Sequence, residues 1–148
     1  MSEQPDAAYE LHDIVLTMDR HAAALLQPLD LTLRQHTALV IINEHPGLRG
    51  RDLAAGLGVT PAGVTGIVRT LTREGLVHDV AEPGEGHRQR LELTTAGRER
   101  LRASTKALST PFDDVVRRAG HDPANLARVL RDVTAEMRRE SQGRRERR

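Results

Sequence analysis

Threonine and arginine side chains recur along the segment "TPAGVTGIVRTLTR", which runs from Thr60 to Arg73. Thr65, Arg69 and Arg73 follow one another at four-residue spacing, which places them on one face of a helix. Hydroxyl and guanidinium groups donate hydrogen bonds to phosphate oxygens and to the edges of bases. The residue types and their spacing therefore indicate contact with nucleic acid.

Two glycines lie in the same segment, on the side away from its apolar residues. Gly63 and Gly66 each cost about 1 kcal/mol relative to Ala in a helix interior, so their presence needs a reason. A helix that enters the major groove of DNA requires small residues where its backbone approaches the bases. The alternative is a loosely constrained exposed face with solvated arginines. We predict DNA contacts at Thr60, Pro61, Ala62, Gly63, Thr65, Gly66, Arg69 and Arg73.

The elements around this segment predict a helix-turn-helix. Thr60 followed by Pro61 is a helix start, with a capping hydroxyl and a proline at the first helical position. Leu53, Ala54 and Leu57 mark a short helix before it. The short turn requires a small residue at the helix crossing, which is Ala54, and a left-handed residue in the turn, which is Gly58.

A β-hairpin is expected after Gly75, because apolar and polar residues alternate on both sides of "PGEGHR". Its tip carries His87, Arg88 and Arg90, which could reach a minor groove or phosphates. A solvated turn is nearly as good an interpretation for His87. Acidic residues in the hairpin leave the electrostatic support weak.

Helical patterns occupy both ends of the chain. Apolar residues step by three and four over residues 8–27, and again after Pro123. Thr32 with Gln35 forms a capping box that starts a helix over residues 33–43. A long helix over residues 95–119 is interrupted at Pro111, where Thr110 could cap a restart. The fold class is therefore mainly α with a small β-hairpin wing, that is, a winged helix-turn-helix lobe between helical arms.

The composition limits the classes of function. The 148 residues suit one domain, and aromatic residues make up only 1%, which favours a helical core of aliphatic side chains. With no Cys there is no disulfide, thiolate metal site or cysteine redox switch. The formal net charge of +1 gives no general evidence for an anionic partner. We find no apolar run of membrane-spanning length and no signal peptide, so a soluble cytoplasmic protein is expected.

The segment "LTLRQHTALVIINEHPGLRGRDLAAGLGVTPAGVTGIVRTLTREGLV…RLELTTAGRERL" resembles the MarR family of bacterial transcription regulators over roughly residues 8–140. "EGLV" before the wing and "LT..G...L" after it are among the more specific marks. The resemblance implies one MarR-like domain over residues 1–148, in which residues 8–27 and 96–142 form a helical dimerisation region. Residues 32–94 would form the DNA-binding lobe, with Thr32 and Gln35 added to its contacts. Residues 143–148 are mostly charged and contain no apolar residue, which by itself predicts a basic tail that is disordered or frayed.

The wing departs from the family pattern. Members usually carry an Asp-x-Arg pair, and the matching positions here hold Glu85 and His87, with Arg88 one residue later. Glu85 retains the acidic charge. Which of His87, Arg88 and Arg90 contacts DNA is left open.

The resemblance also implies a small-molecule effector bound in a cleft near His12, His21 and His36, bounded by Leu16, Leu31 and Val40. For each histidine the alternative is an ordinary partly buried or surface side chain. No histidine pair has the i, i+4 spacing of two metal ligands on one helix, so no metal and no cofactor are predicted.

Three classes of function compete. The leading hypothesis is a repressor that binds a pseudo-palindromic operator in double-stranded DNA as a homodimer, with an effector that shifts the separation of its recognition helices. The second is a winged-helix protein-interaction module without specific DNA binding. The third, an enzyme, is not favoured, because no phosphate-binding loop and no Ser, His and acid grouping are recognisable.

Overall fold

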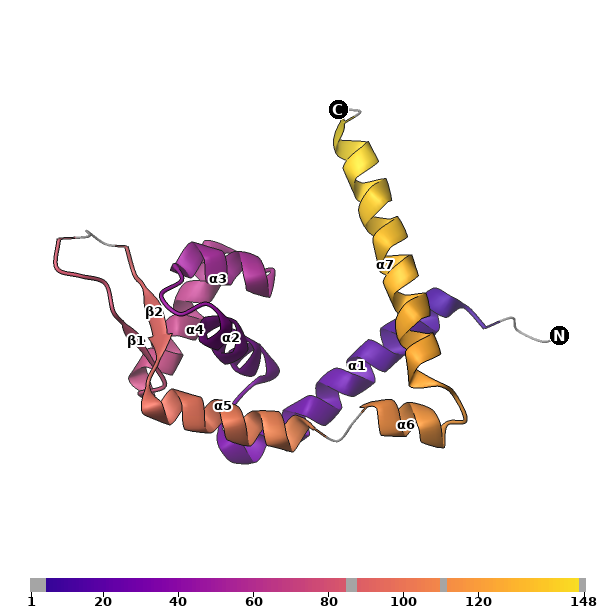
Figure 1. Ribbon diagram of the computed structural model, residues 1–148, viewed down its shortest axis with the longest axis horizontal. Coiled ribbons are helices and arrows are strands. Elements are labelled where there is room, and N and C mark those ends of the chain that lie inside the picture. Colours follow the sequence, from indigo (N-terminus) through magenta and orange to yellow (C-terminus); the bar gives the residue numbers. More distant parts are fainter. Residues whose placement is uncertain (1–4, 85–87, 110–111, 147–148) are drawn as a thin grey trace. The chain divides into compact units, whose positions relative to one another are not determined.

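The computed structural model describes residues 5–84, 88–109 and 112–146. The chain divides into two compact units, residues 1–109 and 110–148, which are described separately. The first unit holds α1 (Ala7–Leu26), α2 (Leu33–Glu44), α3 (Gly50–Leu57), α4 (Pro61–Arg73) and α5 (Thr95–Leu108), together with a hairpin of β1 (Val77–Asp79) and β2 (Leu91–Leu93). Figure 1 shows α2, α3 and α4 grouped beside the hairpin. This grouping is the predicted winged helix-turn-helix.

Local signals in the sequence set the starts of the helices. Asp6 caps α1, since its carboxylate accepts from the Ala8 N–H at 2.9 Å. At α2 the Thr32 hydroxyl accepts from the Gln35 N–H at 3.1 Å while the Gln35 side chain accepts from the Thr32 N–H at 3.0 Å. This is the predicted capping box. The first helix ends before Pro28, which lies in a 3-10 turn over Gln27–Leu29.

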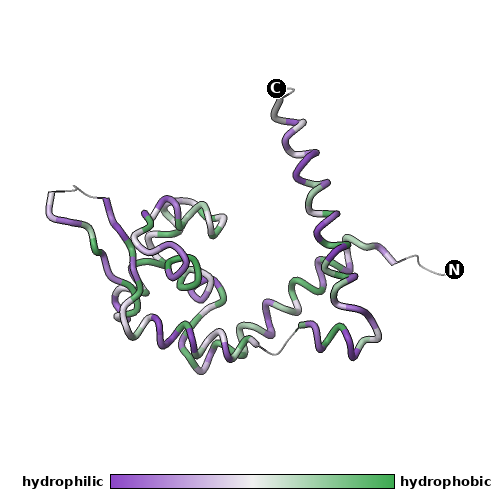
Figure 2. The backbone as a smooth tube through the Cα atoms, in the orientation of Figure 1, coloured by the Kyte–Doolittle hydropathy of each residue, from purple (hydrophilic) through white to green (hydrophobic). Residues whose placement is uncertain are grey.

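The core of the first unit lies under α2, α3, α4 and the hairpin. Its fully buried members are aliphatic, among them Leu26, Leu39, Ile42, Leu53 and Leu71. Each buried leucine or isoleucine contributes roughly 1.5–3 kcal/mol of transfer free energy. Figure 2 shows hydrophobic stretches along α2, whose buried residues are Ala38, Leu39 and Ile42. An aliphatic helical core is what the low aromatic content predicts.

The hairpin is shorter than the alternation predicts. Three antiparallel pairs join the strands, from Val77 with Leu93 to Asp79 with Leu91. On its other edge Leu91 bonds with the chain before α3, because the Leu91 N–H donates to the Leu48 carbonyl at 2.9 Å. The wing is therefore anchored at its base to the start of the helix-turn-helix.

A glycine at the start of α5 allows the helix to pack against the chain that leads into the wing. A Cβ placed on Gly97 would lie 1.9 Å from the Leu76 carbonyl oxygen. Thr94 completes the junction, because its N–H donates to the Leu76 carbonyl at 3.1 Å and its hydroxyl donates to the Gly75 carbonyl at 2.6 Å. The two sequence marks "EGLV" and "LT..G...L" are thus the two sides of one contact.

The second unit consists of α6 (Phe112–Arg118) and α7 (Pro123–Glu146). Asp122 caps α7, since its carboxylate accepts from the Asn125 N–H at 3.0 Å. The expected interruption near Pro111 agrees with the end of α5 at Leu108 and the start of α6 at Phe112, while the proposed cap, Thr110, lies outside the described residues.

Helix α7 continues through Gly143 to Glu146, into the charged tail for which the sequence predicts disorder or fraying. One turn before this tail, Arg139 pairs with Glu136 at 3.1 Å. No helix in the described ranges is long and apolar enough to cross a membrane.

Candidate nucleic-acid interface

The predicted recognition helix is α4, and it begins at the predicted residue. The Thr60 hydroxyl accepts from the Gly63 N–H at 3.1 Å, and Pro61 occupies the first turn. Gly58 takes a φ of 65°, which supplies the left-handed turn between α3 and α4. Ala54 is 2% exposed, as expected for the point where the two helices cross. The local sequence therefore fixes the geometry of the helix-turn-helix.

The two faces of α4 divide as the sequence predicts. Val64, Val68 and Leu71 are buried, whereas all eight positions predicted to contact DNA are exposed. Among the described residues, no heavy atom outside the helix's own backbone lies within 4 Å of a Cβ built on Gly66, and a Cβ on Gly63 would lie 3.3 Å from the Thr60 hydroxyl. The packing of the described residues therefore does not require a glycine at position 66. Both the approach of an outside molecule and a loosely constrained exposed face are consistent with it.

The hydroxyl groups of Thr60 and Thr65 each form one hydrogen bond with the backbone of α4. The Thr65 hydroxyl donates to the Pro61 carbonyl at 3.0 Å, which leaves its oxygen lone pairs for a donor on a base. The capping hydroxyl of Thr60 accepts from Gly63 and keeps its own proton for a phosphate or base acceptor. Arg69 and Arg73 extend beyond them toward the end of the helix.

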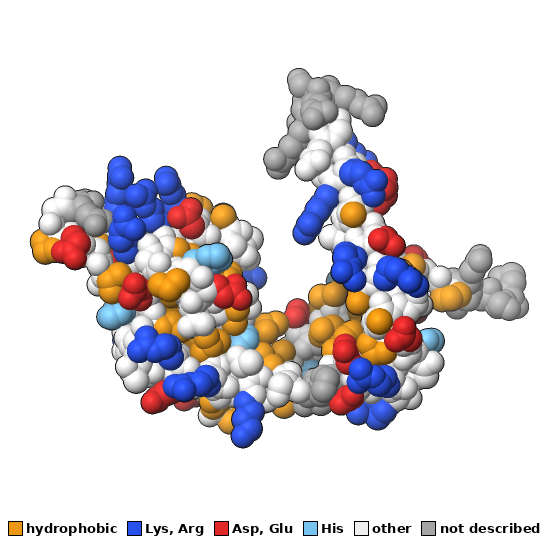
Figure 3. Space-filling model, in the orientation of Figure 1, with side chains coloured by type: hydrophobic (Ala, Val, Ile, Leu, Met, Phe, Trp, Pro, Cys, Tyr) orange, Lys and Arg blue, Asp and Glu red, His pale blue; other side chains and the backbone are white. Residues whose placement is uncertain are grey.

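A hollow lies between α4 and the returning arm of the wing, which is the segment from Arg88 that leads into β2. It is lined by Thr65, Val68, Arg69, Thr72, Arg73 and Gln89. Figure 3 shows Lys and Arg side chains gathered between the hairpin and α3. Gln89 was not among the predicted contacts, although its polar side chain two residues before β2 could have suggested it. A Cβ on Gly50 would lie 3.8 Å from the Gln89 side-chain oxygen, so Gln89 also lies beside the start of α3.

The candidate contact residues of the wing differ in their exposure to solvent. Arg88 is exposed, while Arg90 is half-buried and engaged in an interaction within the protein. Glu85 and His87 lie outside the described residues. The alternatives for the wing contact therefore remain predictions, with Arg88 the most accessible of the described candidates.

Thr32 and Gln35 are held by the capping box at the start of α2. Their side chains satisfy backbone groups of the helix, so in this structure their role is local. A DNA contact there would use the donors that the capping box leaves over, namely the Thr32 hydroxyl proton and the NH2 group of Gln35.

Five of the six effector-site candidates lie on α1 and α2, and the sixth, Leu31, lies two residues before α2 begins. His12, Leu16 and His21 are exposed on α1, Leu31 is buried in the core, and Val40 is half-buried. His36 is half-buried, and its Nδ1 lies 2.8 Å from the hydroxyl of buried Ser104 on α5. The same hydroxyl lies 3.0 Å from the Leu101 carbonyl; when it donates there, the neutral His36 tautomer with a proton on Nδ1 completes the pair. Burial lowers the pKa of His36.

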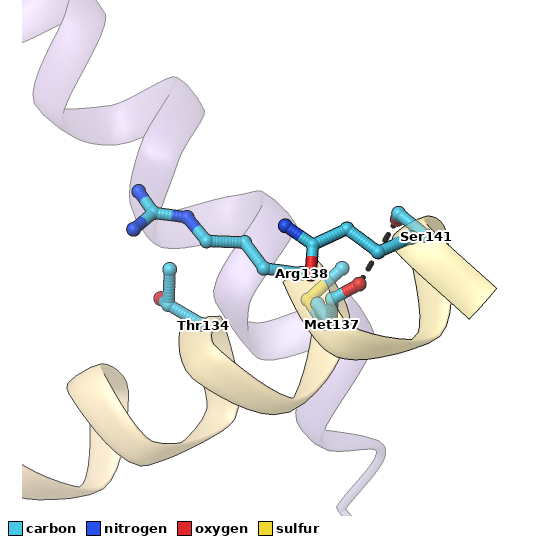
Figure 4. A pocket seen from close by; sticks show the side chains of 5 residues that line it. Thr134, Met137, Arg138 and Ser141 are labelled. Carbon is cyan, nitrogen blue, oxygen red and sulfur yellow. Dashed lines mark hydrogen bonds between the residues drawn. The ribbon is translucent and has the colours of Figure 1, made fainter. Parts of the chain in front are cut away.

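A second hollow runs along α7, lined by Thr134, Met137, Arg138, Ser141 and Gln142 (Figure 4). The hydroxyls of Thr134 and Ser141 donate to the carbonyls one turn earlier, at 2.8 and 2.9 Å. Neither hollow is lined by any effector-site candidate. Among the described residues, no group of three His, Cys, Asp or Glu side chains could hold a metal ion.

A helix-turn-helix with an exposed basic recognition helix and a two-stranded wing defines a winged-helix protein. A family model described as "MarR family" matches residues 29–90. HTH-type transcriptional repressor Rv2887 of Mycobacterium tuberculosis (strain ATCC 25618 / H37Rv) is 30% identical over 140 residues, which cover 95% of this chain and 91% of the relative. The chain belongs to the MarR family.

Solved structures agree on the fold. A Staphylococcus aureus MepR–DNA complex is similar with a TM-score of 0.76 and 22% identity, covering 90% of this chain and 97% of the other. The M. tuberculosis MarR family protein Rv2887 in complex with p-aminosalicylic acid is similar with a TM-score of 0.58 and 26% identity, covering 93% and 94%.

Proposed function

We propose that this protein is a transcription repressor that binds a pseudo-palindromic operator as a homodimer and responds to a small-molecule effector. The observation that carries the proposal is the exposed face of α4, where Thr65, Arg69 and Arg73 stand at four-residue intervals beside a glycine that the protein itself does not require. Relatives named as repressors, rather than as enzymes, support the same class of function. A role on chromosomal DNA places the protein in the cytoplasm.

On this proposal α4 enters the major groove with its first turns against base edges. The exposed residues of those turns, Thr60 to Gly66, are then the base-reading set, and Arg69 and Arg73 bind guanine edges or phosphates. The wing carries Arg88 toward the flanking phosphates or minor groove.

Exposed apolar residues supply the argument for a homodimer. On α1 they include Tyr9, Val15 and Met18, which are 66, 47 and 45% exposed. On α7 they include Val129 and Val133, which are 49 and 48% exposed. A soluble monomer rarely leaves so many large apolar side chains in water, whereas a second copy would cover them. We therefore retain residues 8–27 and 96–142 as the proposed dimerisation region and residues 32–94 as the DNA-binding lobe.

The effector is proposed from the relative whose structure holds p-aminosalicylic acid, an aromatic carboxylate. The candidate residues here, His12, Leu16, His21, Leu31, His36 and Val40, supply apolar walls and imidazole donors. A ligand that binds one dimer geometry better than the other would shift the population away from the DNA-fitting form.

The competing hypothesis is a winged-helix module that docks on another polypeptide through the same face of α4. Fluorescence anisotropy with labelled duplex DNA at 50 and 200 mM salt separates the two, because phosphate contacts make DNA affinity fall steeply with salt. We expect wild-type protein to lose roughly 10³-fold or more in affinity over that range if six or more phosphates are contacted. Arg69→Ala and Arg73→Ala should each weaken binding by about 1–3 kcal/mol. Wild-type protein that binds no duplex at either salt concentration would refute the proposal.

A further inference from the structure

One acidic side chain joins the two arms of the wing at its base. Asp79 is the last residue of β1 and is exposed. Its Oδ1 accepts from the Ala81 N–H at 2.9 Å on its own arm and from the Arg90 N–H at 3.1 Å on the returning arm. A single carboxylate oxygen thus holds residues on both sides of the hairpin.

The register shows what this carboxylate does to the ladder. The strand pairs run from Val77 with Leu93 to Asp79 with Leu91, and beyond them the Val80 N–H donates to the Arg90 carbonyl at 2.8 Å. In a regular antiparallel ladder the Arg90 N–H would return a bond to the Val80 carbonyl. Here it donates to the Asp79 side chain. Asp79 therefore sets the geometry at which the two arms leave the sheet.

The electrostatics point the same way. The two backbone N–H donors, that of Ala81 first, lower the pKa of Asp79, so the side chain is a carboxylate at neutral pH. On a surface that faces DNA, a negative charge by itself opposes binding. The favourable part of this residue must then come from its hydrogen bonds. Glu82, three residues further on, is also exposed, and none of the described residues forms a recorded hydrogen bond with its side chain.

We propose that Asp79 is a positioning residue of the wing: its carboxylate fixes the backbone of Arg90, and through it the approach of Arg88 to the DNA backbone. The inference rests on the proposed DNA-binding function. It also separates two effects of the same side chain, since its charge weakens DNA binding while its acceptor geometry strengthens it. Removing the side chain should therefore weaken DNA binding, whereas removing only its charge should not.

The test compares Asp79→Ala, Asp79→Asn and Asp79→Glu in the full chain, with Glu82→Ala as the matched control. Binding is measured by anisotropy on one 30-base-pair duplex taken from the pool that wild-type protein enriches from random DNA. We expect about tenfold weaker binding for D79A, which loses the acceptor. The same loss is expected for D79E, because its carboxylate is moved by one methylene. D79N keeps an acceptor oxygen without the charge and should bind within about twofold of wild type or tighter, as should E82A.

The salt dependence supplies a readout that a purely structural role would not change. D79A should reduce the slope of log affinity against log salt by about one, since a wing phosphate contact is lost, while its thermal midpoint stays near that of wild type. D79A that binds as tightly as wild type, or more tightly, would overturn the positioning role, and so would D79N as weak as D79A. Wild-type protein without any DNA affinity would instead contradict the proposed function.

Discussion

The winged helix-turn-helix lobe and the terminal helices treat their apolar residues in opposite ways. Leu39, Ile42 and Leu53 in the lobe have no exposed surface, whereas Leu130 on α7 is 40% exposed and Tyr9 on α1 is 66% exposed. The lobe closes its own core within one chain. The terminal helices carry an equally regular apolar stripe that their own chain leaves in water. On the proposed function, the lobe buries its own core and reads DNA, while the exposed apolar residues of the terminal helices meet a second copy of the chain.

The largest expected effect comes from a charge on the exposed stripe. Leu130→Asp should convert dimers to monomers or unfolded chains and lose tight operator binding with it, because an unpaired carboxylate in an interface costs about 3–5 kcal/mol. Sedimentation equilibrium at micromolar concentration measures the dimer. Ala135→Asp, which lies off the stripe of Leu126, Leu130, Val133 and Met137, is the matched control and should remain dimeric. A dimeric L130D with wild-type DNA affinity would remove the contrast between the two regions.

Within the lobe, the next largest effect is expected at the junction of the wing and α5. Gly97→Ala should lower the free energy of unfolding by about 3 kcal/mol, because its Cβ would overlap the Leu76 carbonyl oxygen and the rigid backbone on both sides must move. Urea denaturation measures the loss. Unchanged stability would mean that α5 can shift away from the wing at little cost.

Gly66→Leu should show the reverse behaviour. Helix propensity favours Leu over Gly by roughly 0.8 kcal/mol and the site has open space, so the thermal midpoint should not fall. Operator affinity should drop at least tenfold, because a major groove in close contact has no room for the side chain. If G66L binds normally, Gly63 and Gly66 return to the interpretation of a loosely constrained exposed face.

The smallest effect concerns the contact between α2 and α5. Burial lowers the pKa of His36 below its ordinary value of 6.5, so the unfolded chain takes up a proton first as the pH falls. The stability that this contributes is present above pH 6.5 and is lost as the pH falls below it. His36→Asn keeps an N–H donor for Ser104 and should flatten this pH dependence in urea melts at fixed protein concentration. Exposed His45→Asn is the control, and an equal change in both variants would exclude His36 as the cause.

The sequence predicted those parts of the lobe that depend on neighbouring residues. The capping box of Thr32 and Gln35, the left-handed Gly58 and the outward position of Gly66 are each determined within a few residues, and the structure confirms them. These features also decide which face of α4 is exposed. The candidate DNA-contacting face could therefore be assigned before the fold was known.

The remaining features depend on contacts between distant segments or on small energy differences. The need for Gly97 arises only when α5 meets Leu76, and the role of Asp79 only when the two arms of the wing are paired. Gln89 reaches the interface because the wing lies beside α4. Helix α7 extends to Glu146, past Gly143 and into the run of charges that favours a disordered or frayed tail.

The central claim is that two copies of α4 read one operator. Selection of bound duplexes from a random DNA pool by the full-length protein tests it most directly. We predict an enriched pseudo-palindrome whose half-site centres lie about 10 base pairs apart, since two-fold symmetry places both recognition helices on one face of the duplex. A pool without enrichment, or one enriched for a single unrepeated half-site, would contradict the account.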